Sequence, residues 1–300
     1  MSLLVVGSLA FDDIESPSGK RADILGGSAT YFSLAASAFT PVRMVGAVGE
    51  DFPIETAAEW KPRGIDVAGI EVVKGGKTFR WSGRYQGDMN AAETLKTELN
   101  VLGTFEPKIP KSFRDSDFLF LANTHPATQM SVLRQVERPR FVLADTMNLW
   151  IEHEKPALLE LLKKVDGLLI NDEEARMLAG TRNLIAAGKR ILELGPQVVI
   201  VKKGEHGSFL FSDRLFFALP AYPIDRVTDP TGAGDSFAGG LMGSLARGGK
   251  ASVQDIKRGM VYGTVTASFT VEKFGTEAIA AMDVKMAEAR YAEFLQFVSM

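Results

Sequence analysis

Residues 229–249, "DPTGAGDSFAGGLMGSLARGG", place glycines, two aspartates and a hydroxyl pair directly ahead of a run of small and apolar residues. The run from Ser236 onward has helical spacing, so we expect a buried helix that begins at this point. The N-terminus of a helix carries unpaired N–H groups and the positive end of the helix dipole. Glycines there let backbone amides approach an anion, so Gly232, Ala233 and Gly234 can cradle a phosphate group.

Asp235 follows this glycine-rich turn and lies at the mouth of the expected anion site. A phosphate repels a neighbouring carboxylate, which therefore needs a function there. That function is to accept the proton of a hydroxyl group that attacks the phosphorus. The alternative is a plain N-cap aspartate in a glycine-rich turn. The spacing alone leaves both interpretations open.

Outside this stretch, short apolar runs rich in β-branched residues alternate with longer segments of helical periodicity. The expected strands are residues 2–8, 42–49, 116–123, 140–146, 165–172 and 196–204. The expected helices are residues 26–39, 54–64, 155–164, 172–180 and 183–195. This alternation predicts an α/β fold with a doubly wound, mostly parallel sheet between two helical layers, that is, a three-layer α/β/α arrangement. We expect a single domain over residues 1–300.

Polar residues follow several of the expected strands, and ligands of such sheets bind at the carboxyl ends of strands. These residues are Asp12, Asn123, Asp145, Asn171 and Lys203. The sequence therefore predicts a cleft along one edge of the sheet. For Asp145, the alternative is a capping role for the following helix.

Two segments break the alternation, at about residues 11–24 and 70–105. The second contains a Gly-Gly turn and period-two alternation with aromatic residues, which indicates a hairpin or small sheet apart from the main layer. We interpret both segments as a lid, and an edge hairpin without such a function is the alternative. Arg80 and Arg84 alternate with the aromatic residues, so they either contact a substrate or keep an edge strand soluble.

Composition and charge exclude several classes of protein. Hydrophobic residues make up 46% of the chain and charged residues 24%, with a net charge of −3, so nucleic acids and acidic membrane surfaces are not expected as partners. The chain has no cysteine, which excludes disulfides and thiolate chemistry and fits a cytoplasmic location. The apolar start ends at Asp12 and Asp13 without a basic region, so it predicts a buried strand and no signal peptide.

The common phosphate-loop motifs are absent. "GGKT" at residues 75–78 is preceded by Glu71 where a Walker A loop needs glycine, and no G-x-G-x-x-G follows a strand. The three histidines lie far apart in the sequence, which argues against a histidine metal site.

Residues 229–237, "DPTGAGDSF", resemble the carboxy-terminal signature of the ribokinase (PfkB) family of carbohydrate and nucleoside kinases, usually D-T-T-G-A-G-D-x-F. Further segments resemble the family in the same order, from about residue 5 to about residue 276. They are "GSLAFD" (7–12), "GGSATYFSLAASAF" (26–39), "VGAVGEDF" (45–52), "NDEEA" (171–175), "VKKGEHGSFLF" (201–211) and "ASFTVEKFGT" (267–276). The resemblance implies a ribokinase-like fold and an ATP-dependent kinase that phosphorylates a hydroxyl of a small sugar or nucleoside. The alternative is a non-catalytic sugar- or nucleoside-binding regulatory protein on the same fold.

The resemblance also implies roles for the residues of the signature. Asp235 would be the general base, and the amides of Gly232, Ala233 and Gly234 would stabilise charge on the transferred γ-phosphoryl group. Asp229 is the candidate ligand of a monovalent cation such as K⁺.

The remaining implied roles concern the two substrates and Mg²⁺. The residues implied to bind the acceptor are Asp12, Gly26, Gly27 and Tyr31. The residues implied to bind the nucleotide are Asn171, Lys203, Gly204, Gly207 and Thr231. Glu174 would hold Mg²⁺ through water, because this ion keeps much of its hydration. The expected partners are thus ATP and a small sugar or nucleoside, and a homodimer stays open.

The sequence departs from the family pattern at three positions. Pro230 replaces the usual threonine, and Ser28 and Tyr31 stand where lysine and asparagine are usual. Because the replaced residues bind sugar hydroxyls in relatives, we expect an acceptor other than ribose. The aromatic residues Tyr31, Phe11, Trp81 and Tyr85 could stack against a base or pack in the core, so sugar and nucleoside acceptors both stay open.

Overall fold

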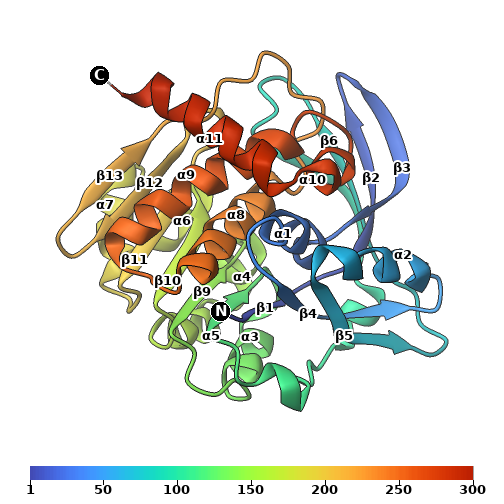
Figure 1. Cartoon of the computed structure of the whole chain (residues 1–300). Helices are drawn as coiled ribbons and strands as arrows, with labels where there is room; N and C mark the ends of the chain where they lie inside the picture. Colours follow the sequence, from blue (N-terminus) through green and yellow to red (C-terminus); the bar gives the residue numbers. More distant parts are fainter. Residues whose placement is uncertain (300) are drawn as a thin grey trace.

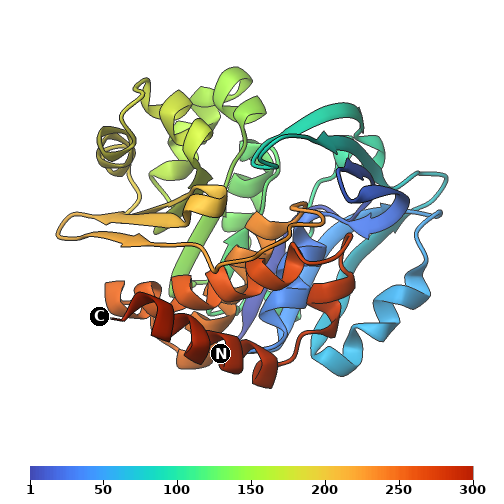
Figure 2. The same cartoon turned by 90° about the horizontal axis from the view of Figure 1, so that it is seen from above.

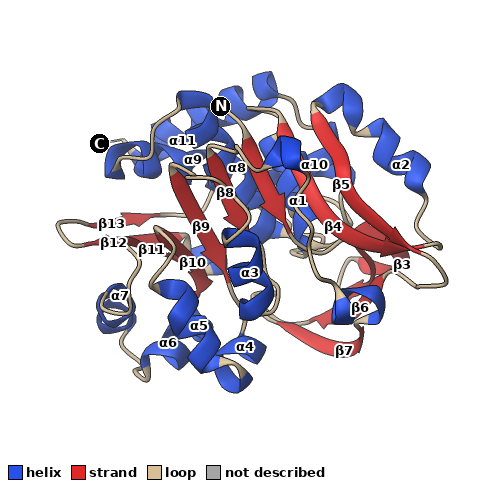
Figure 3. Ribbon diagram, turned by 90° about the horizontal axis from the view of Figure 1, so that it is seen from below, coloured by secondary structure: helices blue, strands red, loops and turns tan. Residues whose placement is uncertain are grey.

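A nine-stranded sheet runs through the centre of the molecule in the computed structural model, which describes residues 1–299 (Figures 1 and 3). The strands lie in the order β13-β12-β11-β10-β9-β8-β1-β4-β5. All neighbours pair in parallel except at one edge, where β12 pairs antiparallel with both β11 and β13. Their bounds are β1 (Leu3–Val6), β4 (Val42–Gly49), β5 (Ile65–Val73), β8 (Phe118–Leu121), β9 (Phe141–Asp145), β10 (Gly167–Asn171), β11 (Val198–Lys202), β12 (Ser208–Ser212) and β13 (Phe216–Leu219).

Helices cover both faces of this sheet (Figure 2). One layer contains α1 (Ser28–Ala36), α2 (Ile54–Glu59), α8 (Ala233–Gly248), α9 (Val253–Thr270), α10 (Glu277–Ala281) and α11 (Val284–Val298). The other contains α3 (Pro126–Leu133), α4 (Asn148–His153), α5 (Lys155–Leu162), α6 (Asp172–Ala179) and α7 (Leu184–Leu192). Short 3-10 turns are η1 (Lys61–Arg63), η2 (Asn100–Thr104), η3 (Lys111–Phe113) and η4 (Gly204–His206). The predicted three-layer α/β architecture is confirmed.

The side chains of each buried strand divide between two hydrophobic cores. Along β1, Leu3 and Val5 pack in the core under α1 and α8, whereas Leu4 and Val6 pack in the core under α3 and α5. This division follows from the two-residue period of a strand. It explains why the parallel strands are continuously apolar in sequence.

The chain reverses its direction of winding at β1. It adds β4 and β5 on one side of β1, then crosses to β8 on the other side and continues outward to β13. In open α/β sheets, the carboxyl ends of the strands around such a switch point form the ligand crevice. The topology therefore locates the candidate site beyond the ends of β1, β8 and β9.

Helix α8 lies very close to its two neighbours. A Cβ atom on Gly239 would lie 2.3 Å from the carbonyl oxygen of Phe32 in α1, and one on Gly240 would lie 2.3 Å from Oγ1 of Thr266 in α9. Any larger side chain would separate the helices. The glycines inside the predicted helix are thus required by packing.

A second, four-stranded sheet stands off the main layer, in the order β3-β2-β6-β7. Its strands are β2 (Ala10–Ser16), β3 (Gly19–Gly26), β6 (Phe79–Tyr85) and β7 (Ala92–Glu98). Both predicted lid segments contribute to this sheet, which we call the lid sheet. Residues 70–73, however, belong to β5 of the main sheet. The expectation that Asp12 ends a strand of the main sheet is also wrong, because Asp12 lies inside β2.

Among residues 1–299, no helix combines the length and the apolar character that crossing a bilayer would require.

We expect Phe32→Ala to lower the free energy of unfolding by about 3–5 kcal/mol, because it leaves a cavity between α1 and the sheet. Phe32 is fully buried, and its ring stacks on Phe120 of β8 at 4.5 Å. Urea denaturation measures the loss. The matched control is Phe297→Ala, where the ring is 53% exposed, and an equal loss in both variants would contradict the assignment of this core.

Candidate active site

The buried carboxyl group of Asp229 ties the loop before α8 to the segment that follows α9. Oδ1 accepts the N–H of Thr231 at 2.9 Å, and Oδ2 accepts the N–H of Gly275 at 2.8 Å. Gly232 is the N-cap of α8, with φ of 73° in the left-handed region that favours glycine. A Cβ there would also lie 2.3 Å from the ring of Tyr31, so the loop packs directly on that ring.

The amides of this loop are only partly available to a ligand. The N–H of Ala233 donates to the carbonyl of Pro230 at 3.1 Å, which is a turn bond inside the loop. Within residues 1–299, the N–H groups of Gly232 and Gly234 find no acceptor. The predicted anion hole thus has two open donors in place of three.

Asp235 lies in the first turn of α8 and is half-buried. Burial and the charge of Asp145 raise the pKa of its carboxyl group and Lys202 lowers it, which leaves the pKa at about 7. The N-cap interpretation of Asp235 is wrong, because Gly232 is the N-cap and α8 has no side-chain capping bond. A carboxyl group with a pKa near neutrality can accept and release a proton under physiological conditions.

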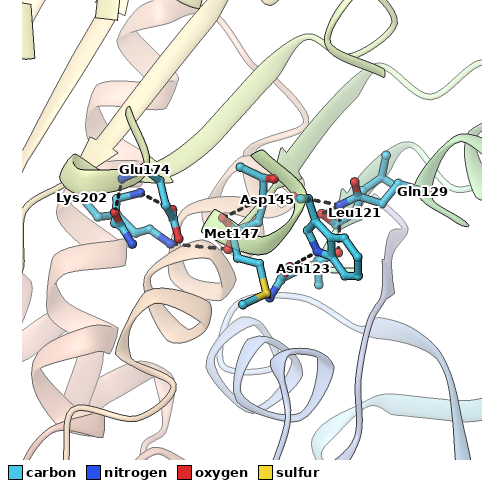
Figure 4. A network of polar contacts seen from close by, with 11 residues as sticks. Leu121, Asn123, Gln129, Asp145, Met147, Glu174 and Lys202 are labelled. Carbon is cyan, nitrogen blue, oxygen red and sulfur yellow. Dashed lines mark hydrogen bonds and ion pairs between the residues drawn. The ribbon is translucent and has the colours of Figure 1, made fainter. Parts of the chain in front are cut away.

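Lys202 supplies a positive charge beside these groups (Figure 4). Its Nζ lies 3.4 Å from Oδ2 of Asp145, and a Cβ on Gly234 would lie 2.9 Å from it. Burial lowers the pKa of Lys202, but Asp145, Glu174 and Asp235 raise it more strongly, so the ammonium stays charged. The side chain is thus aimed at the N-terminus of α8.

Lys203, and not Lys202, is the lysine that the sequence predicts at the site. The Nζ of Lys203 donates to the carbonyl of His206 at 3.1 Å and lies over the ring of Phe209, outside this group. The signal was present in β11, because Lys202 shares its face with Val198 and Ile200, which pack in the core beneath α8. Only the position of α8 shows which face of β11 points toward the site.

Asp145 ends β9, and its backbone carbonyl is bound by the buried side-chain amide of Gln129 (Figure 4). Nε2 of Gln129 in α3 donates to the carbonyl oxygens of Asp145 (2.9 Å), Ala122 (3.0 Å) and Leu121 (3.1 Å). One glutamine therefore joins the carboxyl ends of β8 and β9. The carboxyl group of Asp145 pairs with Lys202. This contact favours the interpretation of Asp145 as a residue of the cleft over its interpretation as a helix cap.

A second contact fixes the other polar strand end. Nε1 of Trp150 donates to Oδ1 of Asn123 at 2.9 Å, and Nδ2 of Asn123 donates to Sδ of Met147 at 3.1 Å (Figure 4). Asn123 thereby joins the end of β8 to α4.

Asn171 and Glu174 form a capping box at the start of α6. Oδ1 of Asn171 accepts the N–H of Glu174 at 2.8 Å, and Oε2 of Glu174 accepts the N–H of Asn171 at 2.9 Å. Burial, together with the charge of Asp145, raises the pKa of Glu174 to about 7. The predicted metal-binding motif is therefore also the element that begins this helix.

Asp12 reaches the site from the lid sheet and is 4% exposed. Burial raises its pKa to about 8, with further contributions from Asp229 and Asp235. A Cβ on Gly26 would lie 1.9 Å from Oδ2 of Asp12, and one on Gly27 would lie 2.5 Å from the carbonyl of Ser8. The Gly26–Gly27 turn is thus shaped around the carboxyl group of Asp12.

The two residues of α1 that depart from the family pattern, Ser28 and Tyr31, are both buried. Ser28 exchanges hydrogen bonds with Ser8, N–H to Oγ in both directions, at 3.0 and 3.1 Å. Tyr31 is 1% exposed beneath Gly232, and its hydroxyl has no partner within residues 1–299. The Tyr31 ring therefore packs under the loop before α8 and is not exposed for stacking on a ligand.

The lid sheet has an inner face toward the site and an outer face. In the parallel pair of β2 and β6, Asp12 stands beside Trp81, so both lie on the inner face. Arg80 and Arg84 lie on the other face, where Arg80 pairs with Asp23 and Arg84 pairs with Glu15 at 3.0 Å. Both arginines therefore form ion pairs on the outer face of the lid sheet.

Gly204 and Gly207 flank η4, beyond the end of β11. A Cβ on Gly204 would lie 2.0 Å from Oδ1 of Asn90, at the turn of the lid sheet between β6 and β7. A Cβ on Gly207 would lie 2.0 Å from the carbonyl of Leu219. Both positions require glycine for close packing, and their contact with a nucleotide stays a prediction.

Comparison with known proteins gives a family match over most of the chain. The family described as "pfkB family carbohydrate kinase" matches residues 22–282. The cytidine kinase of Thermococcus kodakarensis is 28% identical over 254 residues, which cover 83% of this chain and 90% of that protein.

Solved structures share the fold at low identity. The nucleoside kinase of Burkholderia thailandensis in complex with inosine has a TM-score of 0.78 at 18% identity, covering 98% of this chain and 99% of that one. An E. coli protein in complex with ATP and Mg²⁺ has a TM-score of 0.78 at 18% identity, covering 99% of both chains.

We expect the stability of the protein to fall as pH rises from 5 to 8, partly because of Asp12. Its pKa rises from an ordinary value of 3.8 to about 8 on folding, so the folded chain holds a proton that the unfolded chain has lost in this window. Each pH unit with one such proton is worth about 1.4 kcal/mol, so the loss reaches about 2–4 kcal/mol. Urea denaturation at both pH values measures it. Asp12→Asn cannot titrate and should lose clearly less, and the same loss in both proteins would contradict the assignment.

Proposed function

Because the chain belongs to the pfkB family of carbohydrate kinases, we propose that it transfers the γ-phosphoryl group of ATP to a hydroxyl group of a nucleoside, with Asp235 as the general base. The chain is a phosphotransferase of the sugar and nucleoside kinase class, with an alcohol group as acceptor. The observation that carries the proposed mechanism is the position of Asp235 beside the open amides of Gly232 and Gly234 and the ammonium of Lys202.

The proposed step moves one proton and one phosphoryl group. The acceptor oxygen forms a bond to the γ-phosphorus as the bond to the β,γ-bridging oxygen breaks, and ADP leaves. The hydroxyl proton passes to Asp235, whose pKa of about 7 suits this transfer. The amides of Gly232 and Gly234, with Lys202, stabilise the negative charge on the transferred group.

The site has suitable residues for Mg²⁺. This ion prefers oxygen ligands and retains several waters, and the carboxyl groups of Glu174 and Asp145 lie near enough to raise the pKa of Glu174. Glu174, through water, would hold the ion beside the phosphates of ATP. When bound, Mg²⁺ neutralises charge on the phosphate oxygens.

Asp229 supports the proposal of a monovalent cation such as K⁺. The carboxylate is fully buried, and no lysine or arginine in the described part of the chain pairs with it. A buried charge of this kind needs compensation. We expect faster turnover in potassium chloride than in tetramethylammonium chloride at equal ionic strength, and equal turnover in the two salts would contradict a cation at this position.

A nucleoside is favoured over a free sugar by the inner face of the lid sheet. Trp81 lies beside Asp12 on that face, which provides an aromatic surface next to a carboxyl group that can bind sugar hydroxyls. Stacking of a base on such a ring stabilises binding by about 1–3 kcal/mol. The similarity to a cytidine kinase over most of the chain supports the same acceptor class.

A homodimer remains a separate prediction. The non-catalytic alternative is disfavoured because Asp235 and the open amides of Gly232 and Gly234 are in place together.

We expect Asp235→Asn to reduce phosphoryl transfer by at least about 100-fold, because the amide cannot accept the proton, while ATP still binds. The measurement is ADP release from Mg-ATP with a panel of nucleosides and sugars, with ATP affinity measured by calorimetry. Asp213→Asn, on the exposed turn between β12 and β13, is the matched control and should retain full activity. Substantial transfer by Asp235→Asn to an acceptor that the wild type uses would sink the mechanism. ADP release with sugars alone would contradict a nucleoside as the acceptor and would identify a sugar instead.

A further inference from the structure

The lid sheet contacts the loop before α8 through hydrogen bonds from two of its strands. Oγ of Ser16 in β2 donates to the carbonyl of Thr228 at 2.7 Å. At the end of β6, the hydroxyl oxygen of Tyr85 accepts a hydrogen bond from Oγ1 of Thr231 at 3.2 Å. The lid sheet and the loop before α8 are therefore joined directly by hydrogen bonds of the side chains of Ser16 and Tyr85.

The Tyr85 contact lies one residue before the anion hole. Thr231 precedes Gly232, whose N–H is one of the two open donors. The backbone of Thr231 is tied to Asp229, and its side chain is tied only to Tyr85 within residues 1–299. Thr231, and with it the Gly232 amide, is therefore held by one contact within the loop and by one contact from the lid sheet, while Gly232 itself packs on Tyr31.

The surroundings of Tyr85 favour a specific contact over general packing. The side chain is buried, 9% exposed, although β6 belongs to a small sheet with an outward face. Burial raises the pKa of Tyr85, and Asp229, Asp12 and Asp235 raise it further, so the phenol stays neutral among carboxyl groups. A phenylalanine would fill the same space without the oxygen that Thr231 requires.

We propose that Tyr85 is a positioning residue that couples closure of the lid sheet over the acceptor to the geometry of the anion hole at Gly232. When the lid sheet is closed, the Tyr85–Thr231 hydrogen bond holds the loop in the arrangement that stabilises the transferred group. When the lid sheet is open, this hydrogen bond is lost. The loop then no longer stabilises the transferred group, so water attacks the γ-phosphorus slowly. In that side reaction, a water oxygen bonds to the γ-phosphorus, the bridging P–O bond breaks, and ADP and inorganic phosphate form. This inference rests on the proposed kinase function.

The test compares ADP release with and without a saturating acceptor, which gives a stimulation factor for each variant. We expect Tyr85→Phe to lower the acceptor-stimulated kcat about 3–10-fold, the effect of one hydrogen bond of about 1 kcal/mol. The KM for the acceptor and the release of ADP without acceptor should change less than about two-fold. A role in folding alone would lower both rates together.

Arg84→Gln is the matched control on the same strand. Arg84 pairs with Glu15 and Glu93, both inside the lid sheet, so the variant disturbs the lid sheet without touching the loop. Its stimulation factor should equal that of the wild type. An equal drop in Arg84→Gln would overturn the assignment to Tyr85.

A double-mutant cycle with Thr231→Val isolates the hydrogen bond. If the two hydroxyl groups act through each other, the double variant should lose no more stimulation than either single variant, whereas additive losses would overturn the proposal. Failure of the two ideas is distinguishable. A wild type without transfer to any nucleoside or sugar contradicts the kinase function, and a wild-type stimulation factor in Tyr85→Phe contradicts only the coupling.

Discussion

The close packing of α8 against α1 and α9 is the constraint on which the rest of the site depends. Gly239 and Gly240 bring the helix backbone against Phe32 and Thr266, and this contact aims the N-terminus of α8 at the switch point of the sheet. Once that end is fixed, the open amides, Asp235 and the aimed side chain of Lys202 fall within reach of one another. The glycines of the signature therefore have two functions, since those before the helix expose amides and those within it determine where the amides lie.

The charge balance of the site follows from this geometry. Five carboxyl groups, those of Asp12, Asp145, Glu174, Asp229 and Asp235, share a partly buried region with the ammonium of Lys202. Burial raises the pKa of each carboxyl group, so near neutrality the ligand-free protein stores part of this charge as bound protons. A bound cation such as Mg²⁺ would release those protons. The site is thus adapted to bind positive charge and an anion at the same time.

Much of the fold was predictable because its signals are local. The strands of the main sheet are apolar on both faces, and helices such as α5 to α7 carry clear periodicity, so both elements are evident from the residues alone. The lid sheet was predicted from broken alternation, but its boundary was not, because β5 continues as an edge strand to Val73 before the chain leaves the main sheet. Asp12 was assigned to the wrong strand for a similar reason, since apolar residues continue past Gly7 and Ser8 and hide the break between β1 and β2.

The site was less predictable, because it depends on contacts between distant segments. Neither the choice of Lys202 over Lys203 nor the clamp of Gln129 on two strand ends has a sequence signal without the positions of α8 and α3. The Asn171–Glu174 pair has a further consequence. Its reciprocal bonds would begin α6 even in a chain that had lost all catalytic activity, because helix initiation alone selects those two residue types at that spacing. The presence of this motif in a related sequence thus indicates a folded helix. Evidence for catalysis has to come from Asp235.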